Sequence, residues 1–517
     1  MEVAGLALAA PAVVESALKW SAELSTRWDD YKDADGKVGE AVHELQIISS
    51  TIQIWSDILR KIWEEVPHDL QPTLTTHLHI MDSKTRLVAA NLDALIGSRE
   101  RFCSPESIRR KRGSVKKWKY ALHSKEELMK NLEELRRSMR LFDSCFQLLV
   151  LIPSRKLDDS IRGTGSHREG PMMQFRKLRA IQSGRSTSPL PGSSIFLDPN
   201  SFEYVDETRI EFSTASVAIL SRGNIDHKVL VDRAPSSPAM SKEGVRNLAR
   251  KFADVDPAFA HVLPCKGVLQ TSSSFSFVFE IPEGLGSPQT LRSALLKHRT
   301  TYTLTQRIDL AMYLAYSTLF LHQAKFVHKN IRPETIILLS NTYSDHQDGS
   351  LGKPYLIGFD EIRQEDGVTQ MIADDVLEKN IYRHPDRQGL KPQHRYAMQH
   401  DIYSLGVCLL EIGMWKPFIT YSTVTKGGSP VPIPVPSFRK RERKPLELKE
   451  KLVSYAKETL PSIMGAIYTD VVMSCLTCLD ENSEGFGDLG DLFDQDGVIV
   501  GVRYIEKVLK KLHGIRV

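Results

Sequence analysis

Apolar residues in the first third of the chain recur at intervals of three and four positions. This spacing places them on one face of an α-helix. Breaks such as Pro67 separate the stripes, which favours an antiparallel bundle over one long coiled coil. With the leading apolar segment Leu6–Leu24, residues 1–153 are predicted to form at least four helices. The stripes are Val38, Ala41, Leu45, Ile48, Ile52, Trp55, Leu59, Ile62 and Val66; then Leu74, Leu78, Met81, Val88, Leu92 and Leu95; then Trp118, Ala121, Leu128, Leu132, Leu135, Met139, Phe142, Phe146 and Leu149.

The periodicity ends after residue 153, and residues 154–204 are predicted to form a flexible, basic linker. Residues 183–194 are rich in Ser, Pro and Gly, which is typical of a tether. Further on, short apolar stretches such as Val217–Leu220 predict β-strands, and longer helical patterns follow them. The chain is therefore predicted to be multidomain, with an all-α helical bundle followed by an α+β domain over residues 205–517.

The amino-acid composition is typical of a globular protein and argues against several kinds of partner and site. The chain has 517 residues, of which 41% are hydrophobic and 26% charged, as in globular proteins. A net charge of +4 is too small to imply a nucleic-acid partner. Cys475 and Cys478 lack the second ligand pair of a zinc site, so we expect core cysteines and reduced thiols in the cytoplasm. No apolar run approaches the roughly 18 residues of a membrane span, and Met1-Glu2 lacks the basic start of a signal peptide.

The segment Phe326–Leu339 resembles the catalytic loop of protein kinases, with His328 and Lys329 at its start. In that loop an aspartate accepts the proton of the substrate hydroxyl, and a later asparagine binds a second Mg²⁺. The equivalent positions here are Asn330 and Thr335. An amide has no useful proton affinity near neutral pH, so Asn330 cannot act as a general base.

Two further motifs resemble kinase elements. Tyr355–Ile362 resembles the metal-binding segment Asp-Phe-Gly, but Gly358 replaces the aspartate, Phe359 is kept, and Asp360 stands at the glycine position. A carboxylate two residues along a strand lies about 7 Å away. Magnesium demands near-ideal geometry, so its retention is the disfavoured alternative. The segment from Asp401 resembles a kinase helix whose first aspartate anchors the catalytic loop, which implies a structural role for Asp401.

The resemblance implies a bilobal kinase-like fold, with a small lobe over about 205–285 and a large lobe over about 286–517. A kinase needs a Gly-x-Gly-x-x-Gly turn between its first two strands, and only Gly223 lies in that region. The lysine of the third strand has two candidate replacements, Asp232 and Arg233, of which Arg233 is the candidate nucleotide ligand. The resemblance therefore implies a pseudokinase that requires no cofactor, while ATP binding without metal stays open.

A second resemblance concerns the N-terminus. The opening Gly5–Leu8 with Val13 and Val14, and the helix start Lys117–Leu128, are similar to the HeLo domains of fungal incompatibility and cell-death proteins. Those domains are helical bundles whose N-terminal segment is implicated in membrane attack. A buried helix at the bundle edge is the alternative for the first segment; a solvated loop, or a phosphosite at Ser114, is the alternative for the basic stretch 109–119. The candidate lipid-contacting residues are Leu6, Leu8, Val13, Val14, Arg109, Arg110, Lys111, Arg112, Lys116 and Lys117.

A helical bundle joined to a pseudokinase resembles the plan of mixed-lineage kinase-like executioners of cell death and their fungal analogues. This implies a bundle that self-associates or engages anionic lipids, under the control of a kinase-like domain that receives a signal from an upstream protein. A cytoplasmic protein recruited to the plasma membrane, acting in programmed cell death or heterokaryon incompatibility, is the expectation. Two alternatives remain, an atypical active kinase that uses Asp360 and a non-enzymatic scaffold.

Overall fold

A computed structural model describes most of the chain. The described residues are 2–26, 37–102, 114–163, 171–182, 195–198, 203–222, 225–235, 241–253, 255–297, 302–342, 350–359, 363–364, 376–389, 396–426, 429–438, 444–480, 486 and 497–516. The chain divides into two compact units, Met1–Arg176 and Lys177–Val517.

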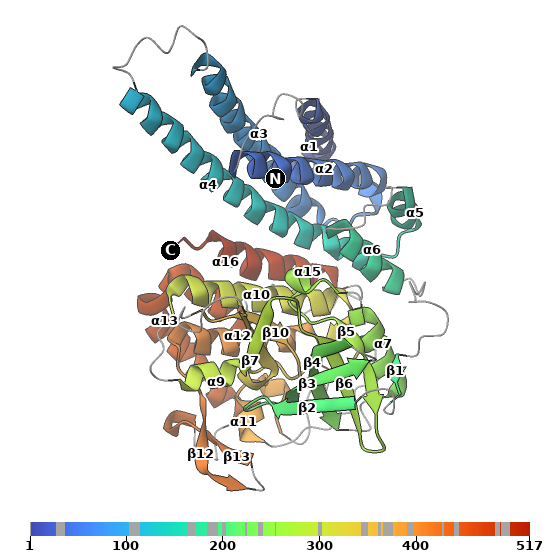
Figure 1. The fold of residues 1–517 in the computed structure, drawn as a ribbon, viewed down its shortest axis with the longest axis vertical. Coiled ribbons are helices and arrows are strands. Elements are labelled where there is room, and N and C mark those ends of the chain that lie inside the picture. Colours follow the sequence, from blue (N-terminus) through green and yellow to red (C-terminus); the bar gives the residue numbers. More distant parts are fainter. Residues whose placement is uncertain are drawn as a thin grey trace. The chain divides into compact units, whose positions relative to one another are not determined.

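The first unit is helical (Figure 1). Its long helices carry the predicted apolar stripes, and stripe residues such as Leu45, Ile52 and Leu132 are fully or almost fully buried. The predicted helical N-terminal region is therefore confirmed. Its elements are α1 Glu2–Ser25, α2 Lys37–Ile62, η2 Trp63–Glu65, α3 Gln71–Phe102, α4 Ser114–Gln147, η4 Leu148–Leu151, α5 Arg155–Gly163 and the start of α6 Pro171–Gln182.

The predicted linker of residues 154–204 starts too early, because part of it folds. The Ser154 hydroxyl accepts a hydrogen bond from Leu157 N (2.9 Å) and so caps the start of α5. Leu157 and Phe175 are fully buried, and Phe175 lies edge-on to Trp55 with ring centroids 5.7 Å apart. These two short helices carry too few apolar residues for their periodicity to stand out in the sequence.

A buried carboxyl group lies in the core of the first unit. Trp55 of α2 packs on Phe146 of α4 with ring centroids 3.8 Å apart, and its Nε1 donates to Asp143 Oδ1 (3.0 Å). Asp143 is 3% exposed. Burial raises the pKa of Asp143 to about 7, and the hydrogen bond from Trp55 only partly opposes this effect.

The second unit begins with a six-stranded sheet of order β1-β5-β6-β4-β3-β2. Only the β1–β5 pairing is parallel, and the other pairs of this sheet are antiparallel. Helix α7 Lys242–Ala253 lies beside β5 (Figure 1), and α8 Pro257–Ala260 follows it. The strands are β1 Phe196–Leu197, β2 Glu203–Arg209, β3 Ala215–Arg222, β4 Ile225–Pro235, β5 Cys265–Gln270 and β6 Ser274–Glu280.

The rest of the second unit is mainly helical, and this confirms its α+β composition. The buried helix α12 crosses α13 closely at Gly406, where a Cβ would lie 2.7 Å from the Cβ of Cys475. The elements are β7 Leu285–Thr290, α9 Leu291–Leu296, α10 Leu304–Gln323, β8 Phe326–Val327, η6 Pro333–Thr335, β9 Ile336–Asn341, β10 Lys353–Leu356, β11 Arg363–Gln364, α11 Leu377–Asn380, η7 Pro385–Arg387, α12 Met398–Met414, β12 Ile419–Lys426, β13 Ser429–Pro434, η8 Pro436–Phe438, α13 Pro445–Leu476, α15 Val498–Tyr504, η9 Ile505–Leu509 and α16 Lys510–Gly514.

One helix in the described part of the chain, α13, is long and apolar enough to cross a bilayer by length and composition. Half of its apolar window is buried, and its path is broken at Gly465 (φ +79°). It also packs along α12. These features are those of a core helix. Cys475 and Cys478, at its end, are both buried.

The raised pKa of Asp143 predicts that acid stabilises the first unit. In the unfolded chain this carboxyl ionises near pH 4, whereas in the folded unit it holds its proton until about pH 7. The contribution of Asp143 to stability should therefore fall as the pH rises from 4 to 7, by up to about 4 kcal/mol. The variant Asp143→Asn should unfold at a higher temperature than the wild type at pH 7.5 and close to it at pH 4.5, measured by calorimetry.

Asp159→Asn is the matched control, because its carboxylate is 73% exposed in the same unit. This control should leave the pH profile of unfolding unchanged. Equal unfolding temperatures for Asp143→Asn and the wild type at both pH values would contradict the prediction.

Candidate functional site

The loop between β8 and β9 is fixed by one buried carboxylate. Asp401, near the start of α12, accepts hydrogen bonds from His328 N (2.7 Å) and Lys329 N (2.9 Å). Tyr396 donates a third one from its hydroxyl (2.8 Å). Lys329 has a left-handed backbone (φ +67°), which costs free energy and which these contacts hold in place. Burial raises the pKa of Asp401 to about 6 despite its donors. Asp401 is therefore a structural anchor of this loop.

Asn330, Thr335 and Gly358 pack against one another. Arg332 Nε donates to Asn330 Oδ1 (2.9 Å), and the Thr335 hydroxyl donates to Asn330 O (2.7 Å). Gly358 has φ +83°, and a Cβ at this position would overlap Thr335 Cγ2 and lie 3.6 Å from Asn330 Nδ2. The Thr335 methyl group thus fills the space where a carboxylate on residue 358 would begin.

Phe359 and His328 complete this cluster from the apolar side. Phe359 is fully buried, with its ring 5.1 Å from those of both Phe252 and His328 and 5.8 Å from that of Phe279. His328 Nε2 lies 3.0 Å from Ile357 O. Helix α7, strand β6 and the loop therefore meet at one aromatic side chain.

An acid on β4 faces this cluster. Asp232 is 1% exposed, and its Oδ2 accepts hydrogen bonds from Gly358 N (2.8 Å) and Phe359 N (3.4 Å). Its Oδ1 accepts one from Thr214 (2.9 Å). Of the two alternatives left by the sequence, Asp232 is therefore the one that contacts Gly358 and Phe359.

Arg233 points to the opposite face of β4, because successive strand residues alternate. Its guanidinium pairs with Glu207 and donates to the Ser216 hydroxyl (3.1 Å), and 44% of its side chain is exposed. Arg233 thus lies on the face away from Gly358 and Phe359, and its role as a nucleotide ligand stays a prediction. A shift of one residue along a strand reverses the face, and the sequence did not fix that register.

The turn between β2 and β3, residues 210–214, contacts the helical part of the unit. Thr290 donates to Glu211 O (3.0 Å), and the Ser293 hydroxyl donates to Glu211 Oε2 (3.1 Å). Phe212, with φ +61°, lies over Tyr421 at a ring distance of 4.3 Å. This turn contains no glycine. Gly223, noted from the sequence, lies outside the described residues.

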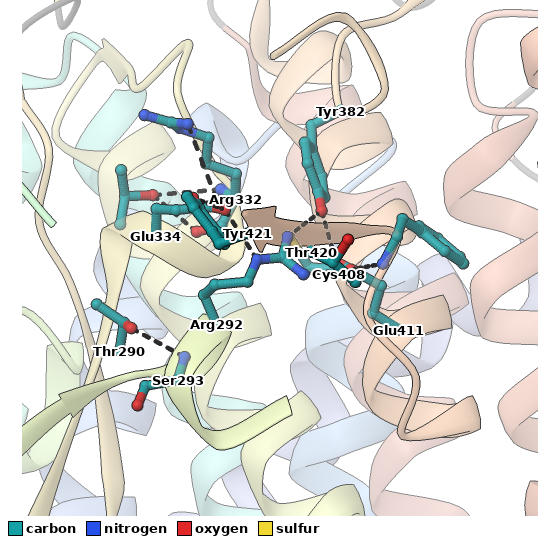
Figure 2. A network of polar contacts seen from close by, with 12 residues as sticks. Thr290, Arg292, Ser293, Arg332, Glu334, Tyr382, Cys408, Glu411, Thr420 and Tyr421 are labelled. Atoms are coloured by element: carbon teal, nitrogen blue, oxygen red, sulfur yellow. Dashed lines mark hydrogen bonds and ion pairs between the residues drawn. The ribbon is translucent and has the colours of Figure 1, made fainter. Parts of the chain in front are cut away.

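A buried arginine links several segments on the helical side (Figure 2). Arg292 of α9 is fully buried and bridges Glu334 (2.8 Å) and Glu411 (3.0 Å). Its guanidinium also donates to the Tyr382 hydroxyl, which in turn donates to Glu411 (2.8 Å). Tyr421 donates to Glu334 (3.1 Å).

The pKa values in this network follow from burial and from the shared cation. Burial alone would raise the pKa of Glu334, but the charges of Arg292 and Arg332, together with hydrogen bonds from Arg292 and the backbone, outweigh burial and lower that pKa. Burial raises the pKa of Glu411, and Arg292 opposes this only in part. The sequence did not single out Arg292, since an arginine early in a helix is usually exposed.

The only group that could hold a metal ion in the described part of the chain consists of His384, Asp386 and His400, whose ligand atoms lie within 4.8 Å of one another. Lys449 Nζ lies 3.3 Å from His384 Nε2 and pairs with Asp480. His384 Nδ1 accepts a hydrogen bond from Asp386 N (3.4 Å) and lies 3.3 Å from Asp386 Oδ2. The pKa of His400 is lowered to about 3, mainly by burial of its ring and next by electrostatic repulsion from His384. We interpret this group as a polar network centred on a lysine.

Several predicted site residues lie outside the described part of the chain. These include Asp360 and the basic residues Arg109, Arg110, Lys111 and Arg112, as well as the side chains of Leu6, Leu8, Lys116 and Lys117. Of the remaining lipid candidates on α1, Val13 is half-buried and Val14 is 3% exposed in the first unit. Val14 therefore matches the alternative of a helix packed into the bundle.

The class of protein that emerges is a two-unit protein with a helical N-terminal region and an α+β region. No family model matches the chain.

The packing of Gly358 on Thr335 predicts a coupled pair of substitutions. Gly358→Ala should destabilise the second unit by about 2–3 kcal/mol, because it adds a Cβ at positive φ and in contact with Thr335. Thr335→Ser removes the obstructing methyl group but keeps the hydroxyl. The double variant should recover about 1 kcal/mol relative to the sum of the single changes, as measured by denaturant unfolding.

Gly389→Ala is the matched control, because Gly389 has a similar φ of +76° and no atom within 4 Å of the added Cβ. Gly389→Ala should lower the free energy of unfolding only by the strain of an alanine at positive φ, and its effect should add to that of Thr335→Ser. Strict additivity of Gly358→Ala and Thr335→Ser would contradict the proposed packing.

Proposed function

We propose that the second unit is a protein-kinase-like domain that does not transfer phosphoryl groups and that controls the helical first unit. The strand order supports the kinase-like fold: β2 to β6 form an antiparallel sheet, a helix lies between β4 and β5 in the chain, and a larger helical part follows. The anchoring of the loop backbone by Asp401 agrees with the same resemblance.

The observation that carries the loss of catalysis is the position of Asp232. Kinases place a lysine on the third strand to hold the nucleotide phosphates. Asp232 occupies the face of β4 directed at Gly358 and Phe359, and it brings a carboxylate there instead of an ammonium. Asp232 therefore presents hydrogen-bond acceptors at the position where a kinase presents a cation to the phosphates, so this position offers a triphosphate no counter-charge.

The other catalytic parts are replaced in the same region. Asn330 cannot accept the substrate proton, and Gly358 offers no ligand atom from a side chain. Thr335 uses its hydroxyl on the Asn330 carbonyl. Removing one such group typically costs orders of magnitude in rate, so the combined replacement supports an inactive domain.

The β2–β3 turn gives a second, steric argument. A kinase covers the nucleotide phosphates with a glycine-rich turn whose backbone amides approach them. In the corresponding turn here, Glu211 accepts a hydrogen bond from Ser293 of α9, and the ring of Phe212 packs on Tyr421 of β12. A domain closed on itself in this way works through its shape and its contacts.

For the first unit we propose self-association and engagement of anionic membrane lipids, released by an upstream signalling protein acting on the kinase-like domain. The helical architecture supports this role, as do the HeLo-like opening segment and the basic stretch 109–119. By this proposal the chain is a cytoplasmic cell-death or incompatibility protein of the fungal type that is recruited to the plasma membrane.

The purified chain should neither bind nor hydrolyse ATP. We expect no shift of the unfolding temperature with MgATP or with ATP alone, because Asp232 stands where a kinase has the lysine that holds the phosphates. We also expect no radioactive phosphate on the chain or on a generic substrate protein. Phosphate incorporation that disappears in Asp360→Ala would instead favour the atypical kinase.

Residues 1–182 should release dye from vesicles that contain phosphatidylserine, and deletion of residues 2–14 should abolish release. Replacing Arg109, Arg110, Lys111 and Arg112 by Gln should weaken vesicle binding by roughly 4 kcal/mol, at about 1 kcal/mol per basic residue. Arg60→Gln with Lys61→Gln is the control, because these exposed cations lie in the same unit, outside the basic stretch. Intact vesicles in every case would favour the scaffold alternative.

A further inference from the structure

Strand β1 adds a short piece of the connecting chain to the edge of the six-stranded sheet. Phe196 pairs with Val268 and Leu197 with Leu269 in parallel register. Val268 N donates to Ile195 O (2.9 Å). Residues 195–198 follow the Ser-, Pro- and Gly-rich stretch after the first unit, so the edge of β5 binds the end of this tether.

The edge of β5 is shaped for this approach at Gly267. This residue has φ +151°, in the region that favours glycine, and it lies at an irregularity in the β5–β6 register. A Cβ here would lie 2.7 Å from Leu197 Cδ2 and 2.8 Å from Ile195 O. Any larger residue at position 267 would push the added strand away.

Both faces of the added strand have contacts. Leu197 packs against the buried cluster of Ala218, Val229, Val231, Leu269 and Val278. Phe196 lies under two cations of α7, with Lys242 Nζ 4.8 Å and Arg246 Cζ 5.6 Å from the ring centroid. This arrangement combines main-chain pairing with side-chain pockets, as in the recognition of peptides by strand addition.

The added strand is nevertheless weakly held. Only two residues pair, and Ile195, Phe196 and Leu197 are each half-buried. Such a short strand stays in place mainly because it belongs to the same chain, which gives it an effective concentration in the millimolar range. A second copy carries an identical segment, and that segment can make the same contacts once its local concentration is comparable.

We propose that the edge of β5, with its Gly267 notch, is a strand-docking site for residues 195–198 of a second copy of this chain. Copies held together then exchange β1 reciprocally, which joins their second units. This inference rests on the proposed self-association through the first unit, because self-association supplies the local concentration.

Cross-linking between two different full-length chains tests the exchange. Continuing the register of β1 on β5 places Asp198 opposite Gln270, and both are exposed. One chain carries Asp198→Cys and the other, with a size tag, carries Gln270→Cys, both in a Cys103→Ser background. The five native cysteines in the described part of the chain are buried. Mixed at about 1 mM each in a glutathione redox buffer, which matches the millimolar effective concentration within one chain, the pair should give at least ten times more mixed disulfide than the register control.

The register control pairs Asp198→Cys with Lys266→Cys, an exposed position about 13 Å along β5 from residue 270. Adding Gly267→Val to the Gln270→Cys chain should remove the mixed product. A single chain with Asp198→Cys and Gln270→Cys should close internally, which reports the resting arrangement.

Internal closure of that double variant without mixed disulfide above the control would overturn the exchange. Failure of internal closure, or a mixed product insensitive to Gly267→Val, would overturn the docking site itself. These readouts are independent of vesicle leakage. Exchange of β1 without vesicle leakage would support this inference and contradict the lipid part of the proposed function. Leakage without exchange would support the lipid part and contradict this inference.

Discussion

Two buried carboxylates that accept backbone N–H groups hold the site of the second unit together. Asp401 binds the amides of His328 and Lys329, and Asp232 binds those of Gly358 and Phe359. The pKa of Asp401, raised to about 6, indicates that its donors do not fully compensate for burial. Burying an ionised carboxylate lowers the stability of the fold, but its hydrogen bonds hold the backbone of the loop in one geometry. Removing either one would leave two buried N–H groups without an acceptor.

The replacements around the loop fit one another, which distinguishes a repacked site from a decayed one. A glycine at 358 permits a positive φ, makes room for the Thr335 methyl group and exposes an amide to Asp232. A carboxylate restored at position 358 would have to displace Thr335 and would then face Asp232. A change at one of these positions therefore conflicts with the others, so the packed arrangement is interdependent.

Much of this architecture could be predicted from the sequence, but the decisive contacts could not. The stripes of the first unit identified its long helices because burial of residues such as Leu45 and Leu132 requires helical spacing. Helices α5 and α6 were missed because their few apolar residues lie in a basic, polar stretch. The choice between Asp232 and Arg233 depended on a one-residue register, and β1 is too short for any periodicity. The packing of Gly358 on Thr335 joins residues that only the fold brings together.

The buried Arg292 shows how such a domain can keep its shape without a ligand. It ties α9 to the loop through Glu334, to α12 through Glu411 and to the segment before η7 through Tyr382. In an enzyme that closes around a nucleotide, part of the closing free energy comes from the bound molecule. Here the contacts of Glu211 and Phe212, together with the Arg292 network, hold the sheet and the helical part together through interactions within one chain. Under the proposed function, a signal that opens this domain has to compete with these internal contacts, and a binding partner of high affinity suits that task better than a freely exchanging nucleotide.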